Sequence, residues 1–513
     1  MLQENHGDTI LVSDLHLSAG YDPRTGTYHR NEDFFYDAAF ARFLHDLCSR
    51  GARERRTWRL VILGDLFDFL QVDTVRPRTA GRGAVTEDTV TVAKLEQIAA
   101  GHAEFFEALG RFVAAGHGLD IVPGNHDIEL VRPAVQERFR ELITEYGGEA
   151  DTSKAAGPVR FHPWILYLPG VLYAEHGHQY DRDNSFSMAL EPYAPDRPGE
   201  IDLPLGSYFV EHLFNRIEAL DPFADNVKPP TRYLRWAFRV HPVMALWLLL
   251  RYYLSFFLIV FTRTSQLTPQ EQESRCERYR EEVLRPYAQQ LGLLHETVVA
   301  IDGLSAKPAM SSRPRLLRAL LIEPFLPLLP LGGGLLALYT WMRNVRFNVR
   351  SLTLFAVGVL GLAWRERRLL RPATQPSGYL HRAALGIDRL LRNEGVEKVP
   401  FYVFGHTHTA EQYPLTIERD GARYLNTGTW TPIVPADFEI LGARERFTFV
   451  QITRDPDTRD PIARLLFWND AASRHEPLPL LGVQPLATFA AEVYERASAV
   501  TGRHGATGSF PRR

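Results

Sequence analysis

Short apolar runs that end at a glycine or a polar residue recur along the chain. Such runs predict buried strands over Thr9–Ser13, Leu60–Leu63, Leu119–Val122, Val171–Ala174 and Phe401–Phe404. Between the first of them, apolar residues recur at three-to-four spacing, which predicts helices over Phe34–Cys48 and Val92–Ala115. Strands that alternate with helices favour an α/β fold whose sheet is covered on both faces.

A different pattern occupies the middle of the chain. The three most apolar segments gather there: Val240–Phe261, Leu316–Met342 and Leu352–Trp364. Residues 231–372 hold nineteen Arg and one Lys against nine Asp and Glu, whereas all 513 residues together have a formal charge of −3. A basic, apolar block inside an otherwise acidic chain predicts a helical insertion.

The predicted organisation is therefore one core in two parts. The boundaries are residues 1–190 for the first part of the core, 191–376 for the insertion, 377–496 for the second part and 497–513 for a tail. The tail consists largely of Gly, Ser, Thr and Arg and is predicted to be disordered.

Composition narrows the class of protein. A chain with 45% hydrophobic and 23% charged residues is neither disordered nor collagen-like. Two cysteines, Cys48 and Cys276, exclude a disulfide framework and a cysteine-based metal site. The first residues lack a basic segment followed by an apolar stretch, so we expect a cytoplasmic protein or one at the inner face of a membrane.

Polar residues follow each of the five predicted strands. They are Asp14 and His16, Asp65 and Asp68, Asn125 and His126, His176 and His178, and His406 and His408. Residues two apart in an extended segment point to the same side, and glycines before several of these residues suit sharp turns. One such pair is common by chance, but five after five strands indicate a metal site. Nitrogen and oxygen ligands without sulfur suit Mn, Fe, Zn or Co.

This series resembles the calcineurin-like metallophosphoesterases. The motifs that carry the resemblance are Asp14-x-His16, Gly64-Asp65-x-x-Asp68, Gly124-Asn125-His126-Asp127, His176 and Gly405-His406-x-His408. It covers about Thr9–Asn184 and Gly378–Asp470 and implies a four-layer α/β sandwich of two mixed sheets flanked by helices.

The resemblance also implies a ligand set for two divalent ions, Mn, Fe or Zn. One ion would be held by Asp14, His16 and His408, and the other by Asn125, His176 and His406. Asp65 would bridge the two ions, since a carboxylate offsets the repulsion between them. The implied activity is a metal-dependent phosphoesterase that attacks with a metal-activated hydroxide.

Two further residues are assigned to proton transfer. His126 is expected over the leaving-group oxygen as general acid, because its neighbour Asn125 already faces a metal. Asp68 would hold the imidazolium of His126; the alternative for Asp68 is a carboxylate that caps a turn or helix. Asp127 is expected to support the loop.

Other polar residues have weaker assignments. Asn426–Trp430 resembles a Gly-Thr-Trp turn common in this superfamily, with a simple hairpin as the alternative. The residues after His176 could touch substrate or could be solvated loop residues: His178, Asp181, Asp183 and Asn184.

The substrate class depends on the insertion. Within the superfamily, the chain is similar to the UDP-2,3-diacylglucosamine hydrolases, which cut a pyrophosphate on a lipid-like nucleotide. It departs from them in length and at Gly177-His178, where they usually have Gly-Asp. We expect a phosphorylated substrate, with a lipid-linked or membrane-derived one favoured. The alternatives are a soluble nucleotide or protein phosphatase, a nuclease and a non-catalytic membrane scaffold. The acidic catalytic part argues against nucleic acid.

The insertion can be placed relative to a membrane in three ways. Since His176 and His406 would share one site, any crossings between them must be even in number. Arg251 interrupts the first apolar segment, Glu323 interrupts the second, and Leu352–Trp364 is shorter than the roughly twenty residues of a span. Interfacial helices whose arginines meet an anionic membrane surface through residues 231–372 are favoured. A two-span hairpin and a soluble cap are the alternatives.

Overall fold

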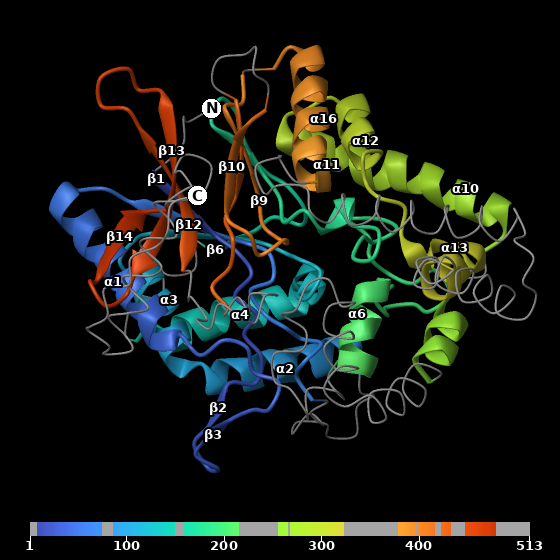
Figure 1. The fold of residues 1–513 in the computed structure, drawn as a ribbon, viewed down its shortest axis with the longest axis horizontal. Helices are drawn as coiled ribbons and strands as arrows, with labels where there is room; N and C mark the ends of the chain where they lie inside the picture. Colours follow the sequence, from blue (N-terminus) through green and yellow to red (C-terminus); the bar gives the residue numbers. More distant parts are fainter. Residues whose placement is uncertain are drawn as a thin grey trace, which may run out of the picture.

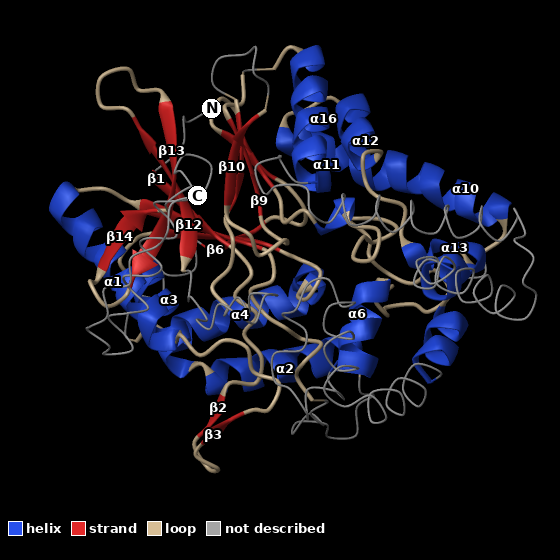
Figure 2. Cartoon of the chain, viewed as in Figure 1, coloured by secondary structure: helices blue, strands red, loops and turns tan. Residues whose placement is uncertain are grey.

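Figure 1 shows the protein as a computed structural model, in which two large sheets lie beside a set of helices. The structure describes residues 8–73, 86–148, 159–214, 255–264, 267–322, 378–396, 398–415, 422–431 and 447–478. Strands and helices are both abundant and the sheets are mixed, so the protein belongs to the α/β class, as the alternating pattern predicted (Figure 2).

The larger sheet has seven strands in the order β14-β13-β12-β1-β4-β5-β6. Their bounds are β1 (Asp8–Val12), β4 (Trp58–Leu63), β5 (Gly118–Val122), β6 (Val159–Phe161), β12 (Thr448–Arg454), β13 (Pro461–Asn469) and β14 (Arg474–Pro477). β1, β4, β5 and β6 run parallel to one another, whereas β12 pairs antiparallel with β1. The central strands are buried on both faces, which explains their continuous apolar runs.

The smaller sheet has five strands in the order β10-β11-β9-β8-β7. Their bounds are β7 (Leu166–Leu168), β8 (Leu172–Ala174), β9 (Phe401–Phe404), β10 (Glu411–Pro414) and β11 (Arg423–Asn426). β8 and β9 are parallel neighbours although some 230 residues separate them, with Ala174 opposite Val403. A separate hairpin is formed by β2 (Tyr21–Asp22) and β3 (Thr27–Tyr28).

Three apolar clusters hold the sheets and helices together. One joins the two sheets, with Leu11 and Val61 from the larger sheet and Leu172 and Val403 from the smaller. The second joins the other face of the larger sheet to four helices. These are α1 (Asp37–Glu54), α2 (Glu87–Gly101), α3 (Ala103–Ala114) and α4 (Pro133–Tyr146).

The third cluster joins the outer face of the smaller sheet to α11 (Arg285–Leu291), α12 (His295–Asp302) and α16 (Gly378–Glu394). The backbone N–H of Ile165 donates to Tyr287 Oη at 2.8 Å, which ties α11 to the segment before β7. Part of the predicted insertion therefore packs directly on the core. Further helices are α6 (Leu205–Phe209), α10 (Pro269–Arg278) and α13 (Arg313–Leu317), and residues 255–263 are also helical.

Short helical turns complete the described elements. The 3-10 turns are Ile128–Val131, His178–Tyr180 and Ala309–Ser311. The π-helical turns are Val210–Phe214, Tyr279–Leu284 and Arg318–Ile322.

All five predicted strands are present, with ends that differ by up to two residues. The helical pattern predicted over Val92–Ala115 is confirmed, but it is divided between two helices: α2 ends at Gly101 and α3 begins at Ala103. The backbone leaves the helical path at His102, where φ is −123°. Another loop approaches closely just before this point, since a Cβ on Gly101 would lie 2.0 Å from the carbonyl oxygen of Ala19.

Most of the predicted apolar segments lie outside the described residues. Of Val240–Phe261 only residues 255–261 are described, and of Leu316–Met342 only residues 316–322. Leu352–Trp364 and the tail, residues 497–513, lie wholly outside them. In the part of the chain that the structure describes, no helix combines the length and the apolar character needed to cross a membrane.

Candidate metal centre

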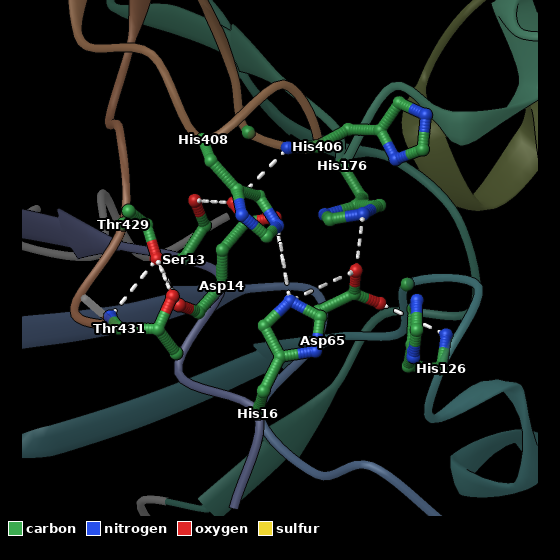
Figure 3. A network of polar contacts seen from close by, with 12 residues as sticks. Ser13, Asp14, His16, Asp65, His126, His176, His406, His408, Thr429 and Thr431 are labelled. Atoms are coloured by element: carbon green, nitrogen blue, oxygen red, sulfur yellow. Dashed lines mark hydrogen bonds and ion pairs between the residues drawn. The ribbon is translucent and has the colours of Figure 1, made fainter. Parts of the chain in front are cut away.

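The polar residues that follow the strands of both sheets meet in one place (Figure 3). Six of the seven predicted ligands are buried: Asp14, His16, Asp65, Asn125, His176 and His406. His408 is half-buried, with 16% of its side chain exposed. A buried set of carboxylates and imidazoles without sulfur could hold a metal ion, and the structure brings these side chains into groups that fit one.

The first group consists of Asp14, His16 and His408, whose potential ligand atoms all lie within 4.8 Å of one another. His408 Nε2 lies 3.2 Å from Asp14 Oδ1 and 3.1 Å from His16 Nε2. These are the three residues that the resemblance assigns to one ion.

The second group consists of Asp65, His176 and His406, again within 4.8 Å. Asp65 Oδ2 lies 3.1 Å from His176 Nε2 and 3.7 Å from His16 Nε2. One carboxylate oxygen thus faces both groups, as a bridging ligand must. His176 Nδ1 contacts the carbonyl oxygen of Leu63 at 2.9 Å, which turns Nε2 toward Asp65.

Asn125 lies beside Asp65, in the segment whose backbone touches that carboxylate. The N–H of His126 donates to Asp65 Oδ1 at 2.9 Å. Asn125 Oδ1 is buried and has no hydrogen-bond partner among the described residues. A buried amide oxygen without a hydrogen-bond partner is costly, and a cation bound within reach of it would supply that partner. The residues present therefore fit a metal ion.

The backbone at the site is itself unusual. Among the described residues, eight other than glycine have positive φ, and five of these are predicted ligands: Asp14, His16, Asp65, His406 and His408, at 51° to 69°. This conformation costs about 1–3 kcal/mol per residue and concentrates at functional sites. It aims side chains inward from sharp turns directly after the strands, which sequence patterns do not reveal.

Two glycines make room for the ligands. A Cβ on Gly64 would lie 2.3 Å from His176 Nδ1, and one on Gly124 would lie 2.1 Å from Asp65 Oδ1. No side chain fits at either position. The glycines noted before the polar residues are therefore required by close approach as well as by the turn.

His126 and Asp68 form a pair at the edge of the site. His126 Nδ1 lies 2.7 Å from Asp68 Oδ2, and 18% of the His126 side chain is exposed, whereas Asp68 is buried. The other Asp68 oxygen accepts from the N–H groups of Leu70 at 3.1 Å and Gln71 at 3.2 Å. One oxygen of Asp68 therefore contacts His126, and the other caps a turn. His126 also lies within 4.8 Å of ligand atoms of His16 and Asp65.

The facing charges set the protonation of the site. Burial alone would raise the pKa of Asp65, but His176 and His126 outweigh it and hold that pKa well below its usual range. For His176 the effects are reversed: burial alone would lower its pKa, but the carboxylates of Asp65 and Asp14 raise that pKa to about 9. A cation that binds here must displace a proton from His176, so binding should strengthen as pH rises.

A supporting network around Asp14 was only partly visible in the sequence. Asp14 Oδ2 accepts from the hydroxyl of Ser13 and from the N–H of His406, the latter at 3.0 Å. Ser13 Oγ lies 2.5 Å from Thr427 Oγ1, and Thr429 Oγ1 donates to the carbonyl of Asp14 at 2.7 Å. The segment predicted as a Gly-Thr-Trp turn or simple hairpin thus orients a predicted ligand. Its motif was recognisable, but its partner was not.

Asp127 supports the two loops, as expected. Its carboxylate accepts from the N–H groups of Gly124 at 2.6 Å, Leu66 at 2.7 Å and Asp65 at 3.3 Å. These bonds tie the loop after β4 to the loop after β5.

The residues after His176 have different environments. His178 is buried, whereas the side chain of Asp183 is 47% exposed and lies beside Arg182. Asp181 Oδ2 lies 3.3 Å from His406 Nε2 and accepts from Asn184 Nδ2 at 2.9 Å. The solvated-loop interpretation is therefore wrong for His178 and Asp181.

Comparison with known proteins adds no relative. No protein-family model matches the chain, and neither does any curated protein. The chemistry of the site therefore has to be argued from its residues and their geometry.

Proposed function

We propose that the protein is a phosphoesterase of the calcineurin-like metallophosphoesterase type, dependent on two divalent ions, Mn, Fe or Zn. The observation that carries the proposal is a pair of adjacent groups linked by Asp65, whose Oδ2 lies 3.1 Å from His176 Nε2 and 3.7 Å from His16 Nε2. Asp14, His16 and His408 form one group, and Asp65 with two further histidines forms the other. That division is the one the resemblance implies for two ions.

The layers of the fold support the same proposal. Helices α1 to α4 share a cluster with the larger sheet, the two sheets share the next, and the smaller sheet shares the third with α11, α12 and α16. This order, helices–sheet–sheet–helices, is what a four-layer metallophosphoesterase sandwich requires. The candidate ligands follow directly after β1, β4, β5, β8 and β9.

Different residues of the chain would have different roles in hydrolysis. Two divalent ions at these positions would supply Lewis acidity to the phosphoryl oxygens and lower the pKa of an attacking water. Asp65 would offset the repulsion between the two positions. His126, whose imidazole is held by Asp68 at 2.7 Å, would donate a proton to the leaving-group oxygen.

The substrate proposal is a lipid-linked or membrane-derived phosphoester or pyrophosphate. It rests on the basic, apolar block at residues 231–372, whose arginines would attract an anionic membrane surface at the cytoplasmic face. A soluble nucleotide or protein substrate is the second candidate. Sedimentation with anionic vesicles, released in part by salt, would favour the first, since surface charge is screened within about 10 Å at 0.1 M salt.

The test combines metal analysis with hydrolysis. Purified protein should carry close to two divalent ions, lose activity with a chelator and regain it with Mn²⁺. The substrate panel is a nitrophenyl phosphate, a bis-nitrophenyl phosphate, a lipid-linked nucleotide pyrophosphate and single-stranded DNA. Hydrolysis of DNA alone would favour a nuclease. A protein that binds no divalent ion and hydrolyses none of the four would refute the proposal.

A further inference from the structure

His406 has a partner outside the two groups. Its Nε2 lies 3.3 Å from Asp181 Oδ2, a contact between residues 225 positions apart. The His406 side chain is 5% exposed and that of Asp181 is 28% exposed. The contact thus lies just beneath the surface, beside the second group.

The second ring nitrogen of His406 is left to face the site. A potential ligand atom of His406 lies within 4.8 Å of those of Asp65 and His176. The His406 and His176 rings are 5.2 Å apart between centroids, and Figure 3 shows His406 beside His176. A neutral imidazole carries one N–H, so when Nε2 donates to a carboxylate, Nδ1 keeps the lone pair that a cation needs.

Asp181 is held in place by its own turn. Its Oδ1 accepts from the N–H of Asp183 at 3.0 Å, and its Oδ2 accepts from Asn184 Nδ2 at 2.9 Å. Its carbonyl accepts from the N–H groups of Asn184 at 3.0 Å and Ser185 at 2.7 Å. A carboxylate fixed from both of its oxygens is built to present one of them in a set direction.

The start of α6 fixes this turn from the other side. The N–H of Gly206 donates to the carbonyl of Asp183 at 2.7 Å. A Cβ on Gly206 would lie 2.1 Å from Asn184 Oδ1, so the two segments are in close contact. The loop after β8 therefore supplies His176 and also a rigid acceptor for His406.

We infer that Asp181 is a positioning residue that holds His406 with Nε2–H turned outward and Nδ1 turned toward the second ion. The inference rests on the proposed two-ion site and adds an asymmetry to it. Asp181 reaches a ligand of the second group, whereas Asp14, His16 and His408 form the first. Loss of Asp181 should therefore weaken the binding of the second ion and leave the binding of the first unchanged.

The test is a titration of chelator-stripped protein with Mn²⁺, followed by calorimetry and by the electron paramagnetic resonance of free Mn²⁺. Wild type should bind two ions. Asp181→Ala should weaken one of them by about 10–100-fold, the usual effect of losing the carboxylate behind a metal-binding histidine. The affinity of Asp181→Asn for this ion should lie between those of wild type and Asp181→Ala, because an amide oxygen can still accept a hydrogen bond from the His406 N–H.

Asp183→Ala is the matched control. It removes a carboxylate from the same loop, but that carboxylate lies beside Arg182 at 3.3 Å. It should bind both ions as wild type does.

A second measurement is independent of metal. Imidazole nitrogen NMR of ¹⁵N-histidine-labelled, metal-free protein reports which nitrogen carries the proton, with the signal assigned through His406→Gln. Wild type should show Nε2–H at His406, and Asp181→Asn should weaken that preference. If Asp181→Ala does not fold, the metal affinity of Asp181→Asn and its imidazole nitrogen spectrum test the inference instead.

The outcomes separate the two ideas. Two ions in wild type, with unchanged affinities in both Asp181 variants and an unchanged tautomer, would overturn the positioning role and leave the phosphoesterase proposal standing. No divalent ion bound by folded wild type would overturn both. An equal loss of affinity for both ions would overturn the predicted asymmetry.

Discussion

We predict that a buried histidine away from the candidate metal centre contributes a pH-dependent part of the protein's stability. His102 Nε2 lies 3.2 Å from Glu32 Oε2, and its Nδ1 lies 2.9 Å from Asp37 Oδ1. Glu32 in turn accepts from the N–H of Gly20 at 2.6 Å and from Ser18 Oγ at 2.8 Å. The histidine therefore links the break between α2 and α3 to the loop that follows the first metal motif.

The size of the effect follows from the pKa of His102. Burial alone would lower that pKa, but the charge of Glu32 and the hydrogen bond to Asp37 raise it from 6.5 to about 9. Such a shift corresponds to roughly 3 kcal/mol of folding free energy. Because the pKa in the folded state lies above that in the unfolded state, this stabilisation is complete below about pH 6.5. It is lost as pH rises through about 9.

The perturbation is His102→Gln, which keeps hydrogen-bonding capacity and removes the charge. We expect the variant to be less stable than wild type by roughly 3 kcal/mol near pH 6, and this difference to shrink strongly by about pH 10. Urea denaturation of metal-free protein, followed by circular dichroism across that range, measures it.

His117→Gln is the matched control for this experiment. His117 is also buried, but burial lowers its pKa, so above about pH 7.5 it is neutral in both the folded and the unfolded state. The difference in stability between its variant and wild type should therefore stay constant between about pH 7.5 and 10, where that of His102→Gln shrinks. Parallel pH curves for wild type and His102→Gln would refute the reasoning.

Three predictions concern the metal centre. Asp65→Asn should lower the metal content more than loss of a ligand from one group alone, because the Asp65 carboxylate faces both groups. A metal content equal to that of wild type, measured by elemental analysis, would contradict the bridging role of Asp65. His126→Ala should keep its metal but lose about 10²–10⁴-fold in hydrolysis of alkyl phosphates and less with nitrophenyl esters, whose leaving group needs no proton; an equal loss on both would contradict the general-acid role. Gly64→Ala should bind Mn²⁺ more weakly in a thermal-shift titration, because its Cβ would lie 2.3 Å from His176 Nδ1. The control is Gly148→Ala, at a position with positive φ but no atom within 4 Å of the added Cβ, and it should bind Mn²⁺ as wild type does.

The sequence was sufficient for the strands and for the chemistry at their ends. Buried strands such as β1 and β9 read as short apolar runs, and Asp14 and His406 follow them directly. Polar residues placed after such runs are local features, so a single sequence reveals them. The resemblance then supplied an expectation that spacing alone does not, namely how the candidate ligands would divide between two ions.

What the sequence did not reveal depends on contacts between distant segments. The bond between Asp181 and His406 and the contact between Ser13 and Thr427 join residues more than two hundred positions apart. The close approach of Ala19 to Gly101, beside the break at His102, likewise joins segments that are distant in the sequence. The left-handed backbone of the predicted ligands is not marked by glycine, the residue that adopts it without cost, so the sequence did not reveal it.

The pairing of β8 with β9 explains how a long insertion can leave the site intact. Glu175 donates its N–H to the carbonyl of Val403 at 3.2 Å, and Gly405 donates to the carbonyl of His176 at 3.0 Å. The chain therefore leaves the centre and returns to it at neighbouring points of one sheet. The entropic cost of closing such a loop rises only slowly with its length. Since this ladder keeps His176 and His406 side by side, any segments between them that cross a membrane must do so an even number of times.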